Sequence, residues 1–478
     1  MRSPLTRRQA LQETAGGLGA VAASWLLQQD AMYASSGSRS QPTLVPREPH
    51  FAPKARSCIF IYMGGAPSTI DMFDYKPNLR KYDGKDSPFL IKGRRLGGSQ
   101  EVMASPFEFK QYGETGRNIS NLLPHFTKVV DEVAFIRSMW TDRIDHSTAQ
   151  FTFASGRGVA GFPSLGSWAS YGLGTENQNL PAFIAMEDSP TTIKRRAFGS
   201  AWLPPIHQGT LMNVENAPIP NLKRADGVSA EDQQDFLRIV NGLNKLHQRD
   251  YPLDADFESR IANFELAARM QLEASEVADI SKESKATREL YGVDDPVSGP
   301  YGARCLTARR LVESGVRFVT VINGQWDHHS NIKEKIEELC KRTDQGVAGL
   351  LADLKARGLL EETLVVWAGE FGRLPTIEAR QEKPGRDHNP YGFTIWMAGG
   401  GVRAGADYGD TDELGWQAIE DVKVSHHDVH ATILHLLGLD VNKLTYEYEG
   451  RAETLTGVQQ NRVVHEILAE SKRVQNRI

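Results

Sequence analysis

Four short apolar runs, each bounded by glycine or polar residues, constrain what this chain can fold into. They are SCIFIYMGG at 57–65, RFVTVIN at 317–323, TLVVWAG at 363–369 and FTIWMAGGG at 393–401. Continuous apolar runs of this length are typical of strands buried on both faces of a parallel sheet. Helical patterns lie between them, and this alternation predicts an α/β fold, a sandwich with a largely parallel sheet.

A charged segment at about 229–290 is predicted to be a helical insertion in this fold. It begins with a capping-box-like pair, Ser229 and Asp232. Apolar residues then recur at helical spacing on one face: Phe236, Val240 and Leu243, followed by Phe257, Ile261 and Phe264.

The N-terminal residues predict export. The pair Arg7-Arg8 precedes the moderately apolar stretch GGLGAVAASWLL, an order typical of a twin-arginine signal. We expect residues 1–34 to be this signal and the protein to be periplasmic or extracellular; a disordered basic leader is the alternative reading. The apolar stretch is shorter than the roughly 20 residues that span a bilayer, so we expect no transmembrane anchor after signal removal.

The composition of the remaining sequence predicts where the domain begins and ends, and it argues against some classes of function. Residues 35–56 are rich in Ser, Pro and Arg and are predicted to be a linker, before one domain at 57–460 and a tail at 461–478. The net charge of −5 disfavours nucleic-acid binding, which needs a basic surface. The chain has three cysteines and no Cys-x-x-Cys pair, so neither a disulfide-built scaffold nor a thiolate zinc site is expected.

Acidic residues and histidines follow the predicted strands. QWDHHSN at 325–331 follows one strand, Glu370 follows another, and GRDHNP at 385–390 precedes a third. In open α/β sheets, sites gather beyond the carboxyl ends of the strands, so these side chains should meet at one edge. Asp oxygens and neutral His nitrogens are ligands for divalent cations. Each motif taken alone fits a polar turn or a structural pair equally well.

Other patterns favour no site. In HHDVH at 426–430, Asp428 stands where a helix begins, so helix capping explains it. AGGGVRAG at 398–405 does not match the dinucleotide pattern G-x-G-x-x-G, and the chain contains neither a Walker lysine motif nor G-x-S-x-G.

Several long segments together resemble one bacterial family, the domain-of-unknown-function family DUF1501. The resemblance runs from about residue 55 to about 460 and rests on SCIFIYMGGAPSTIDMFDYKP, WDHH, WAGEFGRLP, GRDHNPYGFTIWMAGGGVRAG and HDVHATILHLLGLD. This family is related to sulfatases in the alkaline phosphatase superfamily. The resemblance implies an alkaline-phosphatase-like three-layer sandwich with two metal ions at the strand ends, hydrolysing phosphate or sulfate esters.

The resemblance also implies a metal site. Asp327, His329 and His388 resemble the ligands of one metal, for which we expect zinc or manganese, with calcium and magnesium as alternatives. The other half of the site departs from the family pattern. Glu370-Phe371 stands where relatives have Asp-His, and Gly64-Gly65 replaces an Asp at the end of the first strand. Glu370 is expected to complete the site, with Asp71 reaching the same space.

The nucleophile position also differs from that of sulfatases. His146 stands where C-x-P-S-R sulfatases have Cys, and no cysteine lies in residues 140–160, which excludes formylglycine there. Ser147 or Thr148 is then the candidate nucleophile, with His146 as a catalytic group or a further ligand. Arg373 is expected to neutralise an anionic substrate, and Asp387 to orient His388.

Two functions follow. The first is an exported metal-dependent hydrolase acting on sulfate or phosphate esters of a small molecule or a polysaccharide. The second is a non-catalytic protein on the same fold that binds an anionic polysaccharide. The sequence predicts neither the number of metals nor the oligomeric state.

Overall fold

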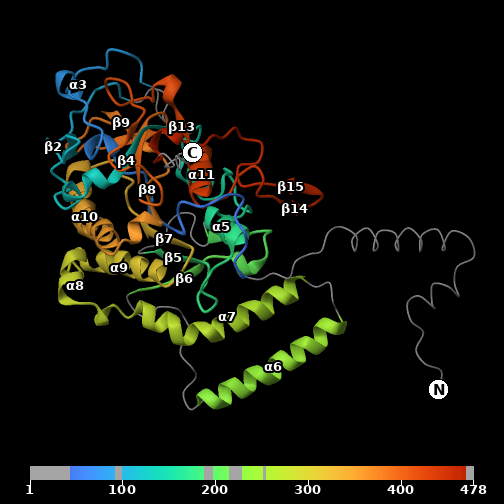
Figure 1. Cartoon of the computed structure of the whole chain (residues 1–478). Coiled ribbons are helices and arrows are strands. Elements are labelled where there is room, and N and C mark those ends of the chain that lie inside the picture. The colour runs from blue at the N-terminus through green and yellow to red at the C-terminus, as the bar shows by residue number, and fades with distance from the viewer. Residues whose placement is uncertain (1–43, 92–98, 188–197, 215–228, 251–254, 470–478) are drawn as a thin grey trace, which may run out of the picture. The chain divides into compact units, whose positions relative to one another are not determined.

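The computed structural model describes residues 44–91, 99–187, 198–214, 229–250 and 255–469. All of these belong to one compact unit, Leu44–Ile478 (Figure 1). The predicted export signal at 1–34 lies outside the described residues. No helix among the described residues is both long enough and apolar enough to cross a membrane.

A nine-stranded sheet organises the unit, and all four predicted strands lie in it. Their bounds are Ser57–Met63 (β1), Phe318–Asn323 (β7), Thr363–Ala368 (β8) and Phe393–Ala398 (β11). Strand β1 lies between β7 and β8 and is parallel to both, with Cys58 opposite Phe318 and Leu364. Strand β11 runs antiparallel to β8. The predicted largely parallel α/β sheet is therefore confirmed.

The sheet extends to both sides of these four strands, in the order β12-β4-β11-β8-β1-β7-β5-β6, with β13 also paired to β4. Strand β4 is antiparallel to β11, so it points the same way as β8 and β1. The further strands are Val133–Trp140 (β4), Phe183–Glu187 (β5), Thr210–Met212 (β6), Asp407–Tyr408 (β12) and Val424–Ser425 (β13).

Helices cover both faces of the sheet and make three layers. The side chains of β1 alternate: Ile59, Ile61 and Met63 belong to one apolar cluster, and Cys58, Phe60 and Tyr62 to the other. The first cluster includes residues of Ala255–Ala278 (α7), Gly299–Glu313 (α9) and Ile332–Ala356 (α10). The second includes residues of His146–Ser155 (α4), Leu165–Leu173 (α5) and His426–Leu436 (α11).

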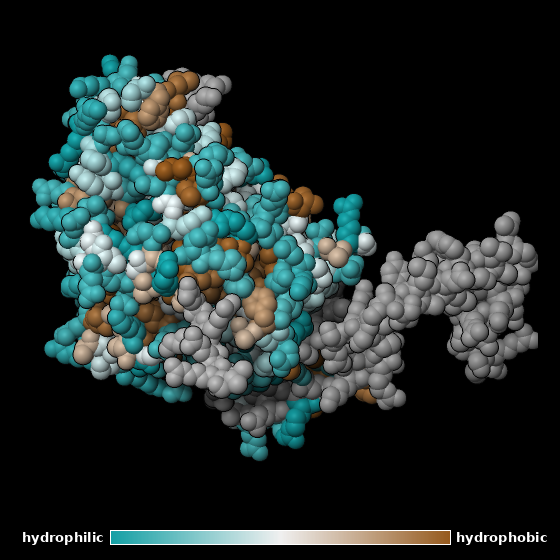
Figure 2. All heavy atoms as spheres, turned by 45° about the horizontal axis from the view of Figure 1, so that its top comes forward, coloured by the Kyte–Doolittle hydropathy of each residue, from teal (hydrophilic) through white to brown (hydrophobic). Residues whose placement is uncertain are grey.

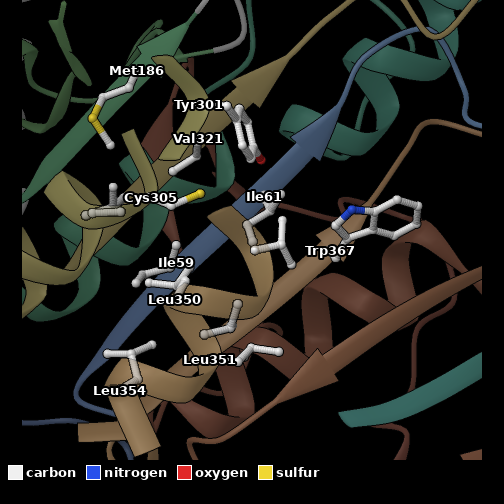
Figure 3. Packing of buried hydrophobic residues seen from close by; sticks show 14 of the residues in the cluster. Ile59, Ile61, Met186, Tyr301, Cys305, Val321, Leu350, Leu351, Leu354 and Trp367 are labelled. Atoms are coloured by element: carbon white, nitrogen blue, oxygen red, sulfur yellow. The ribbon is translucent and has the colours of Figure 1, made fainter. Parts of the chain in front are cut away.

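Figure 3 shows part of the first cluster, where Leu350, Leu351 and Leu354 of α10 lie beside Ile59 and Ile61 of β1. Polar residues prevail on the face of the molecule drawn in Figure 2, with apolar residues scattered among them.

The predicted helical insertion is present. It comprises Ala230–Asp250 (α6), α7, a short 3-10 turn and Lys285–Tyr291 (α8). The Ser229 backbone N–H donates to the Asp232 carboxylate, and the Asp232 N–H donates to the Ser229 hydroxyl, so the predicted capping box is confirmed. Of the predicted apolar face, Phe236 and Leu243 are exposed and Val240 is half-buried.

Both regions predicted to flank the domain contact it. In the predicted linker, Leu44 is buried and the Lys54 backbone N–H donates to the Leu436 carbonyl of α11 at 2.8 Å. In the predicted tail, Ile467 is buried and its carbonyl accepts from the Arg403 N–H at 2.8 Å.

Three small antiparallel pairs lie outside the main sheet. They are Phe109–Tyr112 (β2) with Arg117–Ser120 (β3), Gly372–Ile377 (β9) with Arg386–Asn389 (β10), and Tyr446–Tyr448 (β14) with Arg451–Glu453 (β15). Short helical turns occur at Thr69–Asp71 (η1) and Asn78–Lys81 (α3). The β9–β10 pair matters for the site because it pairs His388 with Arg373.

Candidate metal centre

The carboxyl ends of three sheet strands position the centre. Asp327 and His329 lie in the loop after β7, Glu370 follows β8, and His146 begins α4, which follows β4. The fifth residue, His388, comes from β10. Asp145 caps α4, because its side chain accepts from the Thr148 N–H at 3.0 Å. That cap fixes where the helix starts and therefore where His146 lies.

One ligand atom from each of His146, Asp327, His329 and His388 lies within 4.8 Å of the others, as in a site that could hold a metal ion. Asp327 Oδ1 lies 3.0 Å from His146 Nε2, 2.8 Å from His329 Nε2 and 3.4 Å from His388 Nε2. The Nε2 atoms of His329 and His388 are 3.0 Å apart.

The other ring nitrogen of each histidine faces an acceptor. Nδ1 lies 2.7 Å from Glu370 Oε1 in His146 and 2.6 Å from Glu378 Oε2 in His329. In His388 it lies 2.9 Å from the Ile144 carbonyl oxygen. Carbonyl and ionised carboxylate oxygens only accept hydrogen bonds, so Nδ1 carries the proton in all three rings. The Nε2 atoms are then the ones that point at one another and at Asp327.

This donor set fits a divalent cation. Nitrogen lone pairs facing each other and a carboxylate oxygen repel unless a positive charge, either a proton on Nε2 or a metal ion, lies between them. Neutral imidazole nitrogens and carboxylate oxygens are ligands of zinc and manganese. Metal-bound histidines almost always donate their second ring N–H to a carboxylate or a carbonyl, which is the arrangement found here.

Glu370 lies behind His146 and is not in that four-residue group. It is fully buried and accepts from the Tyr62 hydroxyl, the Gly65 N–H and the Gln150 amide, each at 2.9 Å, besides His146. Burial acts to raise the pKa of Glu370, but the hydrogen bond from His146 and the other contacts hold that pKa below its ordinary value. Glu370 therefore stays ionised and fixes the tautomer of His146.

The carboxylates also act on the protonation of His146. Burial acts to lower the pKa of His146, but Asp327 and Glu370 outweigh it and raise this pKa to about 9 when no cation is bound. Burial acts to raise the pKa of Asp327, and its contacts with the three histidines and Arg373 hold it far below its ordinary value. Asp327 is thus ionised at any ordinary pH.

Arg373 is fully buried and donates to Asp327 Oδ1 at 2.6 Å. Its other hydrogen bonds go to backbone carbonyls of three separate segments: Gly65, Ala66, Trp326 and Arg386. The guanidinium therefore points at Asp327 and ties together the segments around the centre, instead of facing solvent.

Asp71 lies elsewhere in the core. It is fully buried and forms a bidentate pair with Arg386, at 2.8 and 3.0 Å, and accepts from the Ser68 hydroxyl at 2.6 Å. The structure does not bring it into the four-residue group. Ser147 is exposed on the first turn of α4, next to His146.

A second group of potential ligands shares one histidine with the first. Glu378 and Asp387 flank Nδ1 of His329, at 2.6 and 4.0 Å. Asp387 also accepts from the backbone N–H of His388 at 2.8 Å. No sequence motif marks Glu378 or the Ile144 carbonyl, and only the strand pairing of β9 with β10 could have suggested the former.

Glycine allows the loop after β1 to lie against Asp327. Gly65 has φ +109°, and a Cβ on it would lie 2.8 Å from the backbone nitrogens of Trp326 and Asp327. A side chain at this position would displace the segment that carries the carboxylate.

Within HHDVH, Asp428 caps the helix, as predicted. Ser425 and Asp428 form a capping box at the start of α11. His430 is buried and its Nε2 lies 2.7 Å from the Phe153 carbonyl oxygen.

A family model described as "Protein of unknown function (DUF1501)" matches residues 55–468. No curated protein matches the sequence.

Among solved structures, the PsFucS1 sulfatase from Pseudoalteromonas sp. is 12% identical, with a TM-score of 0.36 over 82% of this chain and 68% of that chain. The alkaline phosphatase from the Antarctic bacterium TAB5 is 10% identical, with a TM-score of 0.35 over 81% and 99%. The phosphonate monoester hydrolase SpPMH from Silicibacter pomeroyi is 8% identical, with a TM-score of 0.35 over 83% and 75%. At these TM-scores the functional conclusion has to rest on the residues of the site.

Proposed function

Because this chain belongs to the DUF1501 family, whose description names no reaction, we propose a function from its own site: metal-dependent hydrolysis of anionic esters. His146, Asp327, His329 and His388 would hold one divalent cation, zinc or manganese, with calcium and magnesium as alternatives. Sulfate or phosphate esters of a small molecule or a polysaccharide are the proposed substrates, since WDHH and GRDHNP resemble the metal-binding turns of sulfatases.

One observation carries the proposal. Three histidines, each with a proton held on Nδ1, direct their Nε2 atoms towards Asp327 Oδ1. A cation bound there would polarise an ester oxygen or lower the pKa of a bound water towards about 7.

Other residues of the site would orient the metal ligands and attack the substrate. Glu370 and Glu378 hold the rings of His146 and His329, and Arg373 holds the Asp327 carboxylate from the buried side. The Asp327 side chain is 42% exposed and His329 is half-buried, so an ester can approach the centre from the side of these two residues. His388 is fully buried. The exposed Ser147 hydroxyl, beside His146, is the proposed nucleophile.

Export by the twin-arginine route, to the periplasm or beyond, is part of the same proposal. It rests on Arg7-Arg8 and the apolar stretch that follows.

The test is an ester screen on metal-loaded protein purified without chelator. We expect turnover of p-nitrophenyl sulfate or p-nitrophenyl phosphate that is lost in His388→Ala and retained in His465→Ala, a matched change at an exposed histidine outside the centre. Equal turnover in wild type and His388→Ala would show that the centre takes no part in the reaction.

A second candidate function is binding of an anionic ligand without cleavage. The observation that favours it is the number of protein ligands: three histidines and one aspartate already fill a tetrahedral site, as in structural zinc centres, whereas catalytic zinc centres keep one position open. Metal-loaded protein that binds a sulfated polysaccharide but turns over no ester would support this candidate.

A further inference from the structure

A hollow of about 380 Å³ lies between the segment 140–143, the end of α4, the start of α11 and residues 458–460. Its volume is within the range of about 300–1,000 Å³ that is usual for ligand pockets. Two guanidinium groups, those of Arg143 and Arg157, line it together with His426, His427 and the amides of Gln459 and Gln460.

Glycine leaves room for both guanidiniums. A Cβ on Gly158 would lie 3.2 Å from Cζ of Arg143, and a Cβ on Gly457 would overlap the guanidinium of Arg157. The Arg157 guanidinium also lies over the ring of Phe162, at 5.2 Å from its centroid. The contact with Phe162 restricts the Arg157 side chain before any ligand arrives, which reduces the entropy lost on binding.

The ion pairs of Arg143 and Arg157 leave guanidinium N–H donors available for a ligand. Arg143 Nε lies 3.2 Å from Asp142, which is 65% exposed, and this buried Nε has no hydrogen bond with suitable geometry among the described residues. Arg157 lies 3.3 Å from Glu453 and 3.4 Å from the Thr454 carbonyl. These distances exceed the roughly 2.7–2.9 Å of a strong charge-assisted hydrogen bond, and each guanidinium has five N–H donors.

Two further features leave hydrogen-bond donors that can face an oxyanion. His426 is buried, and neither ring nitrogen has a hydrogen bond with suitable geometry in the described part of the chain. The hollow also includes Ser425, His426 and His427 at the N-terminus of the 11-residue helix α11, where the helix dipole is positive.

One segment joins the hollow to the metal centre. Residues 140–143 line the hollow, and the next residues supply the Ile144 carbonyl that holds His388 and the ring of His146. We propose that the hollow binds a second sulfate, phosphate or carboxylate group of a polyanionic ester whose scissile group lies at the metal centre. The identity of the whole ligand rests on the proposed function, whereas the anion site itself does not.

The first experiment tests the anion site independently of the proposed function. Inorganic sulfate, inorganic phosphate and acetate are titrated by calorimetry into metal-loaded wild type and into His388→Ala, whose metal centre is disabled. We expect His388→Ala to keep one site for at least one of these anions, and the preferred anion to identify the chemistry of the second group.

Substitutions in the hollow then test its residues in the His388→Ala background. Arg143→Gln and Arg157→Gln should each weaken that binding about ten-fold, and Arg380→Gln, a matched change at an exposed arginine elsewhere, should leave it unchanged. Thermal unfolding of each variant checks that it is folded; Arg143→Gln is the cleaner of the two because Arg157 packs over Gly457. Binding that is absent in His388→Ala, or unaffected by Arg143→Gln in folded protein, would overturn the inference even if wild type hydrolyses esters.

Discussion

Each histidine of the metal centre is oriented by a different acceptor. For His146 it is a fully buried carboxylate with three other donors, for His329 the Glu378 carboxylate, and for His388 a backbone carbonyl. Of these, the Glu378 carboxylate can be altered with the least effect on the surrounding core.

We predict that Glu378→Gln weakens metal binding about 10–100-fold, the usual effect of losing such a partner. A Gln amide can donate as well as accept, so it no longer fixes the proton on Nδ1 of His329. Competition with a chromophoric chelator measures the affinity. Glu337→Gln, on α10 with its side chain 45% exposed, is the matched control; equal affinities in the two variants would contradict the role given to Glu378.

At the scale of residues, the sequence predicted which residue types form the site and that they meet at one edge of the sheet. It did not predict which side chains contact one another. The strand-exit rule placed Asp327, His329 and Glu370 at one edge, and the structure brings them there with His388 and His146. The rule could not say that Asp71 pairs with Arg386 or that Arg373 turns inward. Those outcomes depend on which buried charges meet in three dimensions.

Two buried arginines tie the β9–β10 pair to the rest of the molecule. Arg386, in β10, holds Asp71 of the turn after β1, and Arg373, in β9, holds Asp327 of the loop after β7. The first pair is completely buried, whereas Asp327 is partly exposed.

We predict that Arg386→Met destabilises the fold by about 3–5 kcal/mol, because Asp71 would keep an uncompensated buried charge. Arg373→Met should destabilise less, because solvent reaches Asp327, but it should also lower metal affinity by freeing that carboxylate. Chemical denaturation and metal titration of both variants test this. If the folded Arg386→Met protein lost its metal while Arg373→Met kept it, these roles would have to be exchanged.

Strand β10 approaches the metal-binding loop only because residue 385 is glycine. A Cβ on Gly385 would overlap backbone atoms of residues 328–330. We predict that Gly385→Ala destabilises the protein by about 1–3 kcal/mol, the usual effect of overpacking, and weakens metal binding. Gly242→Ala, in α6 with nothing within 4 Å of the added carbon, should instead be neutral or stabilise by up to about 1 kcal/mol. Equal effects of the two changes in thermal unfolding would argue against a close approach at Gly385.

Among the elements, the apolar runs predicted four strands of the sheet, and periodicity predicted the helical insertion. Strand β4 escaped prediction because its sequence, VAFIRSMW, is interrupted by a charge. In the structure Arg137 reaches outward to Asp407 at 3.0 Å while its guanidinium lies over the Phe135 ring. The exposure of Phe236 and Leu243 on α6 was not predictable either, because periodicity marks an apolar face without showing what covers it.

For the whole molecule, two buried histidines predict sensitivity to acid. Burial lowers the pKa of His207 and of His430 to about 3, with smaller contributions from the charge on Arg47 and from His427. Both groups have an ordinary pKa near 6.5 when unfolded, so the unfolded chain binds more protons between about pH 3 and 6.5. The stability from these groups is complete above pH 6.5 and is lost as the pH falls towards 3.

We therefore predict that the free energy of unfolding falls between pH 6.5 and 4, and that the fall is shallower in the double variant His207→Gln/His430→Gln. The comparison is made in the His388→Ala background, so that acid release of metal does not contribute. Identical slopes in the two proteins would exclude these histidines as the cause.

The α/β sandwich with a largely parallel sheet followed from the alternating elements, and the three layers from the family resemblance; both are confirmed, whereas the reaction did not follow from either. One fold supports many chemistries, so the proposed function rests on the four residues of the candidate metal centre.

Metal content is the measurement that tests this account most directly. The mature protein is purified without chelator or metal-affinity resin and analysed by mass spectrometry of its elements, beside Asp327→Ala. The account predicts one equivalent of zinc, manganese or a similar divalent ion per chain, and a folded Asp327→Ala protein with almost none. A wild-type protein that holds no metal and takes up none on titration, or an Asp327→Ala variant with full occupancy, would contradict it.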